Sequence, residues 1–347
     1  MSKKYLVVKG HCGLGNRLHC LVGAIVYSKL TGRELIVDWS DGMYGKEGEN
    51  SFEQLIKCEY AKTDLGEIID SKSVYPSIWS GKLDKTINQI GSHPDWIKQN
   101  IVGLPSCSLK DGGYSSDVIV FCSFRHDLHH IPKELFLNSE FAGMEEDEMI
   151  RYVFENYINI APLVKEKTKE FQSKYLDKPA IGIHVRYSDL PVGRSNKKYH
   201  QALGTLLKKY PDLRIFIATD SRNVLHEFKT MYPNVHSLNK WYPDKAGKPI
   251  HYSCDTNDCL QMGVDAMADM FLLGTCDYLI YCKYSSFTFY TLYTTSISQE
   301  NIIPIGTGDM SVNFYWRLKG ILRIKQRLCC SFLKRRTIFK KPINLIK

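Results

Sequence analysis

Residues 5–38, YLVVKGHCGLGNRLHCLVGAIVYSKLTGRELIVD, decide the fold class of this chain. The apolar run Tyr5–Lys9 predicts a strand, and a glycine-rich turn follows it. Apolar residues then recur at helical spacing until Gly32, whose residue type ends helices because it tolerates a left-handed backbone. A second apolar run, Glu34–Asp38, predicts the next strand. Strand, helix and strand in this order predict an α/β fold with a parallel sheet.

The same alternation returns in the second half of the 347-residue chain, which is long enough for two domains. Strands are expected over residues 179–186, 213–219, 277–282 and 301–305. Helices are expected over residues 197–209, 260–273 and 286–296. A charged, mostly helical segment over residues 145–174 leads between the two series. We therefore predict two parallel-sheet domains, 1–160 and 175–312, with a cleft at the carboxyl ends of their strands.

The net charge of +9 belongs to the end of the chain. Residues 317–347 contain eleven Lys and Arg and no acidic residue, and without them the chain carries −2. A nearly neutral body argues against a nucleic-acid-binding protein, which needs a basic folded face. Basic and apolar residues alternate in this tail, so it is either an amphipathic helix on a membrane surface or a disordered basic extension.

The chain shows no membrane span and no disulfide framework. No run approaches the roughly 20 apolar residues that cross a bilayer, and the N-terminal apolar run is a strand and not a signal peptide. The eleven cysteines have no regular spacing, which indicates reduced thiols in a cytoplasmic protein. His251, Cys254 and Cys259 resemble metal ligands faintly, but no second matching pair follows.

A histidine and an arginine follow an apolar strand in the run His184-Val-Arg186-Tyr-Ser-Asp189. Residues two apart in a strand point to the same side, so His184 and Arg186 share a face. A guanidinium held at a strand end presents its donors in a rigid fork, which suits phosphate oxygens. The run indicates either a phosphate-binding arginine or a structural ion pair between Arg186 and Asp189.

The turn Gly13-Leu-Gly-Asn16-Arg17 lies between a predicted strand and a predicted helix. Glycines at such a place let backbone N–H groups approach an anion, and a helix start favours negative charge. The third glycine of the dinucleotide-binding fingerprint is missing. The turn is equally typical of an anion site and of a tight strand-to-helix connection.

Two carboxylates, Asp265 and Asp269, lie four residues apart on the predicted helix 260–273. They flank its apolar face, and like charges at this spacing repel each other slightly. From the residues alone, we interpret them as a solvated acidic surface. The alternative is that Asp269, one turn before the end of the helix, accepts hydrogen bonds from a nucleobase or a ribose.

Further polar residues follow predicted strands at the same sheet edge. The run Ser285-Ser286-Phe287 opens a helix, so its serines predict an N-cap, and the same geometry can seat an anion. Asp220 comes directly after the strand 213–219, and its residue type predicts a cap for the next helix.

Together these runs resemble the NodZ-like fucosyltransferases and the wider superfamily of α1,6-, α1,2- and protein O-fucosyltransferases. The resemblance covers about Lys9 to Ser296. The residues that carry it are Gly13-Leu-Gly-Asn16-Arg17, Thr31-Gly-Arg-Glu-Leu-Ile-Val-Asp38-Trp39, Ile183-His184-Val-Arg186, Ala218-Thr219-Asp220, and the block from Asp265-Ala-Met-Ala-Asp269 to Ser285-Ser286-Phe287. No single run is decisive, but five in this order are specific.

The resemblance implies a GT-B-like fold, in which two Rossmann-like domains face a cleft, and GDP-β-L-fucose as the donor. Residues 1–160 would then form the acceptor side and residues 175–312 the GDP-sugar-binding domain. Each matching residue takes a role in one donor site: Arg186 on the β-phosphate, His184 and Asp220 beside the donor, Asp269 on guanine, Ser285, Ser286 and Phe287 on the ribose and pyrophosphate, and Gly13 and Asn16 from the N-terminal domain.

The implied reaction is an inverting transfer of fucose to a glycan hydroxyl, on a cell-surface or lipid-linked oligosaccharide, in polysaccharide biosynthesis. Arg186 and the helix start at Ser286 would stabilise the departing pyrophosphate, so no metal is expected. The chain departs from the α1,6-enzymes after the histidine, where they carry a second arginine and then a glutamate. The general base is therefore open among Asp189, which we place beside Arg186 in the catalytic set, and Asp38, Asp41 and His11.

Two other functions fit the same sequence. One is a transferase that uses another nucleotide sugar, and the other is a non-catalytic protein that binds a nucleotide sugar or a glycan. For the enzyme, we expect a cytoplasmic location, possible contact with the inner face of the membrane through the tail, and no nucleic-acid partner.

Overall fold

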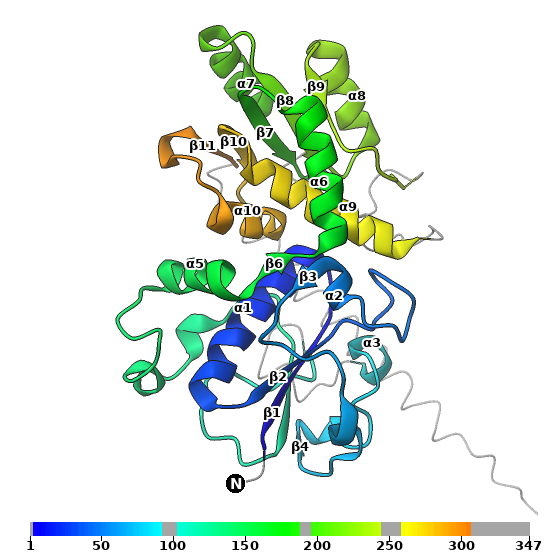
Figure 1. The fold of residues 1–347 in the computed structure, drawn as a ribbon, viewed down its shortest axis with the longest axis vertical. Helices are drawn as coiled ribbons and strands as arrows, with labels where there is room; N and C mark the ends of the chain where they lie inside the picture. Colours follow the sequence, from blue (N-terminus) through cyan, green and yellow to red (C-terminus); the bar gives the residue numbers. More distant parts are fainter. Residues whose placement is uncertain (1–2, 92–102, 188–195, 244–257, 307–347) are drawn as a thin grey trace, which may run out of the picture. The chain divides into compact units, whose positions relative to one another are not determined.

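A computed structural model describes residues 3–91, 103–187, 196–243 and 258–306 (Figure 1). Residues 1–91 and 105–306 form one compact unit, which contains two parallel sheets. Of the second unit, residues 92–104 and 307–347, only Gly103 and Leu104 are described. The basic tail, residues 317–347, therefore lies outside the described residues.

The N-terminal sheet has the strand order β2-β1-β5-β4, and its strands are parallel (Figure 1). They are β1 (Tyr5–Lys9), β2 (Glu34–Asp38), β4 (Val74–Tyr75) and β5 (Val118–Phe121). Helix α1 (Leu14–Thr31) connects β1 to β2 and ends at Gly32, which has a φ of 65°. The predicted strand–helix–strand unit is confirmed, because only a crossover of this kind joins parallel neighbours.

The C-terminal sheet has the order β11-β10-β7-β8-β9 and is also parallel. Its strands are β7 (Ala180–Val185), β8 (Arg214–Thr219), β9 (Val235–His236), β10 (Tyr278–Cys282) and β11 (Ile302–Ile305). In the register, His184 lies between Ala218 of β8 and Tyr281 of β10. The residues that follow these three strands therefore share one edge of the sheet, where ligands bind in open parallel sheets.

Helices cover both faces of the C-terminal sheet. They are α7 (Lys197–Lys209) and α8 (Arg222–Met231) on one face and α9 (Cys259–Gly274) on the other. Helix α6 (Pro162–Tyr175) packs on α9, and α10 (Phe289–Thr294) packs on α9 and on α5 (Glu146–Tyr157). Helices α5 and α6 belong to the segment that leads from one sheet to the other (Figure 1). Short elements complete the first half: α2 (Phe52–Leu55), α3 (Ile87–Ile90), and β3 (Ile56–Lys57) paired with β6 (Asn159–Ile160).

Strand β7 shows how the core orients the site. Ile181, Ile183 and Val185 pack into a hydrophobic cluster with Tyr199 of α7 and Phe228 of α8. The alternate residues point to the other face, where Gly182 lies against Leu273 of α9. His184 continues this second face, because strand side chains alternate. A larger hydrophobic cluster includes residues of both sheets, so the domain limits at residues 160 and 175 remain predictions.

The described cysteines only partly match the expectation of reduced thiols. Seven of them are free and buried, but Cys259 is disulfide-bonded. The other two residues of the faint metal motif, His251 and Cys254, lie outside the described ranges. Among the helices that the structure describes, none combines the length and the apolar character needed to span a bilayer.

Candidate functional site

The site begins at the carboxyl end of β7 with His184. Its imidazole is buried and stacks on the ring of Phe287, with centroids 4.9 Å apart and planes 13° apart. Burial, with smaller effects of the Arg186 and Lys240 charges, lowers the pKa of His184 to about 3. His184 is therefore neutral at physiological pH. Its Nδ1 is buried and has no hydrogen-bond partner in the described part of the chain.

Arg186 lies two residues further along the same edge and pairs with Asp220. Its Nε is 3.4 Å from Oδ2 of Asp220, while Oδ1 of Asp220 accepts a hydrogen bond from the Tyr187 backbone at 2.8 Å. The carboxylate at the end of β8 thus orients the guanidinium at the end of β7. Asp189, the partner named in the alternative interpretation, lies outside the described residues.

The prediction that Asp220 caps the following helix is wrong. Ser221 caps α8, because its hydroxyl accepts a hydrogen bond from the Val224 backbone at 3.4 Å. A cap lies directly before the first helical turn, so the one-residue offset frees Asp220 for Arg186.

The interpretation of Asp265 and Asp269 as a solvated surface is also wrong, since both are buried. Asp265 pairs with Lys167 of α6, and Oδ2 of Asp269 pairs with Nζ of Lys240. The packing of α6 and of the chain after β9 against α9 encloses this face, which the periodicity of α9 alone did not reveal. Oδ1 of Asp269 is buried and has no hydrogen-bond partner among the described residues.

Lys240 and Tyr242 join the site, although neither was expected from the sequence. Nζ of Lys240 lies 5.5 Å from the centroid of the Tyr242 ring, and its charge lowers the pKa of His184. The buried hydroxyl of Tyr242 has no hydrogen-bond partner where the chain is described. Their position could have indicated a functional role, because both residues lie at the start of the long irregular segment that follows a strand.

The serines after β10 confirm the predicted N-cap. The Ser285 hydroxyl accepts a hydrogen bond from the Phe287 backbone at 3.3 Å, and a 3-10 helix, Ser286–Thr288, leads into α10. This cap fixes the turn that carries the Phe287 ring to His184. The alternative, an anion seat at this turn, stays a prediction.

The glycine-rich turn before α1 lies against the same serines. Gly13 is the N-cap residue of α1, and its carbonyl accepts hydrogen bonds from the Asn16 and Arg17 backbones at 3.0 and 3.2 Å. A Cβ on Gly15 would lie 2.2 Å from the Ser286 carbonyl oxygen. The glycine at position 15 is thus required by backbone packing, which favours a tight strand-to-helix connection. Whether the turn also binds an anion stays a prediction.

Buried aromatic and charged side chains surround Arg17 beneath this turn. Nη2 of Arg17 lies 2.6 Å from Oδ2 of Asp41, and the guanidinium carbon lies 5.1 Å from the Tyr44 ring centroid. The Tyr44 hydroxyl accepts a hydrogen bond from the Leu14 backbone. Burial raises the pKa of Tyr44 to about 12, and the charge of Arg186 reaches this hydroxyl. The charge of Arg186, which follows β7, thus acts on a residue from the first half of the chain.

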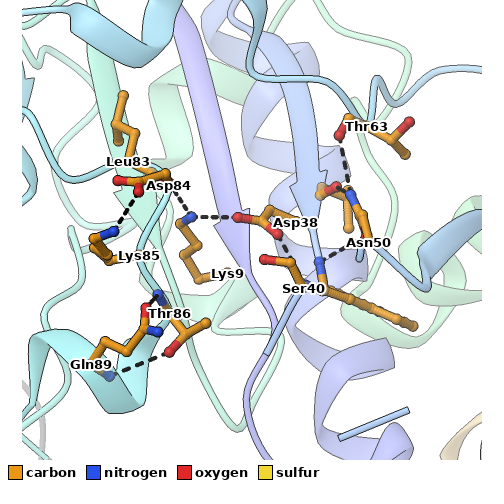
Figure 2. A network of polar contacts seen from close by, with 12 residues as sticks. Lys9, Asp38, Ser40, Asn50, Thr63, Leu83, Asp84, Lys85, Thr86 and Gln89 are labelled. Atoms are coloured by element: carbon orange, nitrogen blue, oxygen red, sulfur yellow. Dashed lines mark hydrogen bonds and ion pairs between the residues drawn. The ribbon is translucent and has the colours of Figure 1, made fainter. Parts of the chain in front are cut away.

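The candidate bases differ in how their oxygens are used. Oδ2 of Asp38 pairs with Nζ of Lys9, which also donates to the Leu83 carbonyl, and Oδ1 of Asp38 accepts from the Ser40 backbone (Figure 2). Both oxygens of Asp38 are thus occupied by structural contacts.

Asp41 differs from Asp38 in having one carboxylate oxygen that the described contacts do not use. Oδ1 of Asp41 is buried and accepts no hydrogen bond from any described residue, while Oδ2 is held by Arg17. His11 is half-buried, with its ring centroid 5.7 Å from that of Phe124. The contacts therefore argue against Asp38 as the general base, and Asp41 and His11 stay candidates for it.

Comparisons with known proteins agree with this architecture. A family model described as Nodulation protein Z (NodZ) matches residues 143–303. Nodulation protein Z of Sinorhizobium fredii is 23% identical over 334 residues, which cover 90% of this chain and 96% of the relative. The crystal structure of fucosyltransferase NodZ from Bradyrhizobium matches with a TM-score of 0.58 at 20% identity, covering 84% of this chain and 93% of that one. A NodZ α-1,6-fucosyltransferase soaked with GDP-fucose matches with a TM-score of 0.58 at 19% identity, with the same coverage.

The two parallel sheets of this chain match the GT-B-like fold of that solved fucosyltransferase. Both the match to the NodZ model and the similarity over almost the whole length of a curated relative point to one group of proteins with this fold. The chain is thus similar to the NodZ fucosyltransferases, by the family model over residues 143–303 and by one curated relative over 90% of the chain.

Proposed function

We propose that this protein transfers L-fucose from GDP-fucose to a hydroxyl of a glycan, with inversion at the anomeric carbon. The observation that carries the proposal is the Arg186 guanidinium, fixed by Asp220 at the strand edge beside a neutral His184. A similar solved structure was soaked with GDP-fucose, which supports the same donor here.

In this proposal the donor site has a phosphate end and a base end. Arg186 binds the β-phosphate, and the turn Ser285–Phe287 takes the ribose and pyrophosphate. At the base end, Asp269 offers its unused Oδ1 to the N–H donors of guanine. Gly13 and Asn16 approach the donor from the start of α1, which lies against Ser286.

The chemical step needs charge stabilisation and a base. Departure of GDP leaves negative charge on the pyrophosphate, and a preorganised guanidinium stabilises that charge more in the transition state than in the ground state. Arg186 and the N–H groups at the Ser286 turn supply this without a metal ion. For the acceptor hydroxyl, we propose Asp189 as the base, and Asp41 is the alternative because its Oδ1 accepts no hydrogen bond from the described residues.

We propose a cell-surface or lipid-linked oligosaccharide as the acceptor and a cytoplasmic enzyme in polysaccharide biosynthesis. The support is the alternation of basic and apolar residues over 317–347, which suits contact with an anionic membrane face. Deleting this tail should leave turnover on a soluble oligosaccharide unchanged and reduce binding to vesicles that contain anionic lipid.

The experiment for the main proposal is nucleotide release from a panel of donors. The full-length protein is incubated with GDP-fucose, GDP-mannose and UDP-sugars, with soluble oligosaccharides as acceptors, and the product is analysed by mass spectrometry and NMR. We expect GDP release and a new fucosyl linkage of inverted configuration with GDP-fucose alone. Turnover with a different donor indicates the other-sugar transferase, and binding without turnover indicates the non-catalytic protein.

A further inference from the structure

Lys240 and Asp269 form an ion pair that is almost completely removed from water. The side chain of Lys240 is 9% exposed and that of Asp269 is 1% exposed. The pair lies between α9 and the chain that follows β9, and the Lys240 charge reaches His184. It is therefore part of the base end of the proposed donor site, although Lys240 belongs to none of the runs that resemble the family.

The ion pair with Lys240 engages one oxygen of the Asp269 carboxylate and leaves the other oxygen without a hydrogen bond from the described residues. Oδ2 accepts from Nζ of Lys240, and the buried Oδ1 accepts from no described residue. A buried acceptor without a partner is costly, so a native site that keeps one is arranged for something that fills it. The missing group is a hydrogen-bond donor.

We propose that Lys240 determines base selectivity: through Oδ2 it keeps Asp269 ionised, so that Oδ1 accepts the N–H donors of guanine. The proposal rests on GDP-fucose as the donor. Guanine presents N1–H and the 2-amino group side by side. An ionised carboxylate accepts both, whereas a protonated carboxyl has itself become a donor. Adenine carries no hydrogen on N1 and no 2-amino group, so it gains nothing from Asp269.

Other charges around Asp269 do not replace Lys240. Burial raises the pKa of Asp269, and Lys240 is the main opposing influence. Lys167 opposes it only weakly and is already paired with Asp265, whose own charge adds to the rise. Tyr242 packs beside Lys240 and carries no positive charge. Without Lys240, the pKa of Asp269 rises further and the balance shifts towards the neutral carboxyl.

The test measures GDP, IDP and ADP binding to the full-length protein by calorimetry, from pH 6 to 9. Lys240→Met removes the charge, and Lys240→Arg retains it. We expect the wild type to prefer GDP over ADP, and Lys240→Met to lose at least about tenfold in GDP affinity with ADP unchanged. IDP lacks the 2-amino group and should lie between the two. In Lys240→Met, GDP affinity should rise with pH more steeply than in the wild type, because guanine binds the ionised carboxylate.

The matched control is Lys167→Met on α6. It breaks the ion pair with Asp265, which lies one turn before Asp269 on α9. It should leave the GDP-to-ADP ratio within about twofold, while Lys240→Arg should restore most of the preference. If Lys240→Met keeps the wild-type ratio and pH profile, the inference is wrong while the proposed function stands. A wild type that binds no guanine nucleotide contradicts both. If Lys240→Met does not fold, Lys240→Gln takes its place, because glutamine keeps a donor to Asp269 but no charge, and the same ratio decides.

Discussion

Arg186 at the end of β7 and Asp220 at the end of β8 are joined by a contact of 3.4 Å between Nε and Oδ2. The carboxylate engages Nε, the inner nitrogen, so the guanidinium is oriented from its base. We expect Arg186→Ala to lower GDP release from GDP-fucose by at least ~100-fold, the scale for losing one electrostatic stabiliser. Arg186→Lys should not restore the rate, because an ammonium lacks the planar fork.

The rate is measured as GDP release under single-turnover conditions. Arg151→Ala, at an exposed position of α5, is the matched arginine control and should keep the wild-type rate. Near-normal turnover in Arg186→Ala would contradict the proposal that this residue binds the pyrophosphate.

Gly15→Ala tests the contact between α1 and the Ser285–Phe287 turn. The added Cβ would lie 2.2 Å from the Ser286 carbonyl oxygen, so backbone must move. We expect a loss of about 1–3 kcal/mol in the free energy of unfolding, the range for overpacking. Gly204→Ala on α7 is the control, since its Cβ meets nothing within 4 Å. It should stabilise by up to about 1 kcal/mol, as helical alanine does. Equal effects in urea titrations would contradict the contact.

Breaking the buried pair of Lys9 and Asp38 should be expensive. Lys9→Met leaves a carboxylate that is 8% exposed without its counter-ion. We expect a loss of about 3–5 kcal/mol in the free energy of unfolding. The exposed pair of Lys62 and Glu34 is the control, and Lys62→Met should cost less than about 1 kcal/mol. Chemical denaturation of both variants measures the difference, and a Lys9→Met protein as stable as the wild type would show that Asp38 finds another partner.

One buried and one partly buried histidine should make the protein sensitive to acid. The pKa of His184 and that of His19 are both lowered to about 3, mainly by burial, against 6.5 in an unfolded chain. Between pH 6.5 and 3 the unfolded chain binds more protons, so stability is retained above pH 6.5 and falls below it. Each histidine costs roughly 1.4 kcal/mol per pH unit there.

His19→Phe keeps the stacking on Phe289 and removes the titrating group. Urea titrations at pH 7.5, 6.5 and 5.5 should show a shallower acid slope for this variant. His226→Phe, at an exposed position of α8, should leave the slope unchanged. An unchanged slope in His19→Phe would mean that His19 is protonated in the folded state.

Chelation tests the proposal that no metal takes part in catalysis. We expect EDTA, followed by removal of the chelator, to leave the rate of GDP release unchanged, because in the proposed mechanism Arg186 would supply the positive charge at the pyrophosphate. A loss of activity that Mg²⁺ or Mn²⁺ restores would replace this proposal with a metal-assisted one.

The fold was largely predictable because its signals are local. Apolar runs predicted β1 and β2 with their observed bounds, and the bounds of α7 were also predicted. Helix α1 ends before Gly32 as predicted, but it begins at Leu14, inside the run that was predicted to be a turn. The polar strand ends were predictable as a group, since parallel strands align their carboxyl ends. The ion-pair partners of these side chains were not predictable, because they depend on packing between distant segments. Asp220 pairs with Arg186, and Lys240 pairs with Asp269. No spacing rule connects residues 29 or more positions apart.

Two glycines mark where the first half of the chain meets the second. Gly15 of α1 lies against the Ser286 backbone, and a Cβ on Gly263 of α9 would lie 3.0 Å from side-chain atoms of Tyr44 and Leu55. These contacts limit modular exchange. A chimera can combine the first half of one relative with the second half of another. It keeps these two contacts only if the residues on both sides of each contact are compatible. Chimeras of this chain with its relatives should therefore transfer the turn Ser285–Phe287 together with α1.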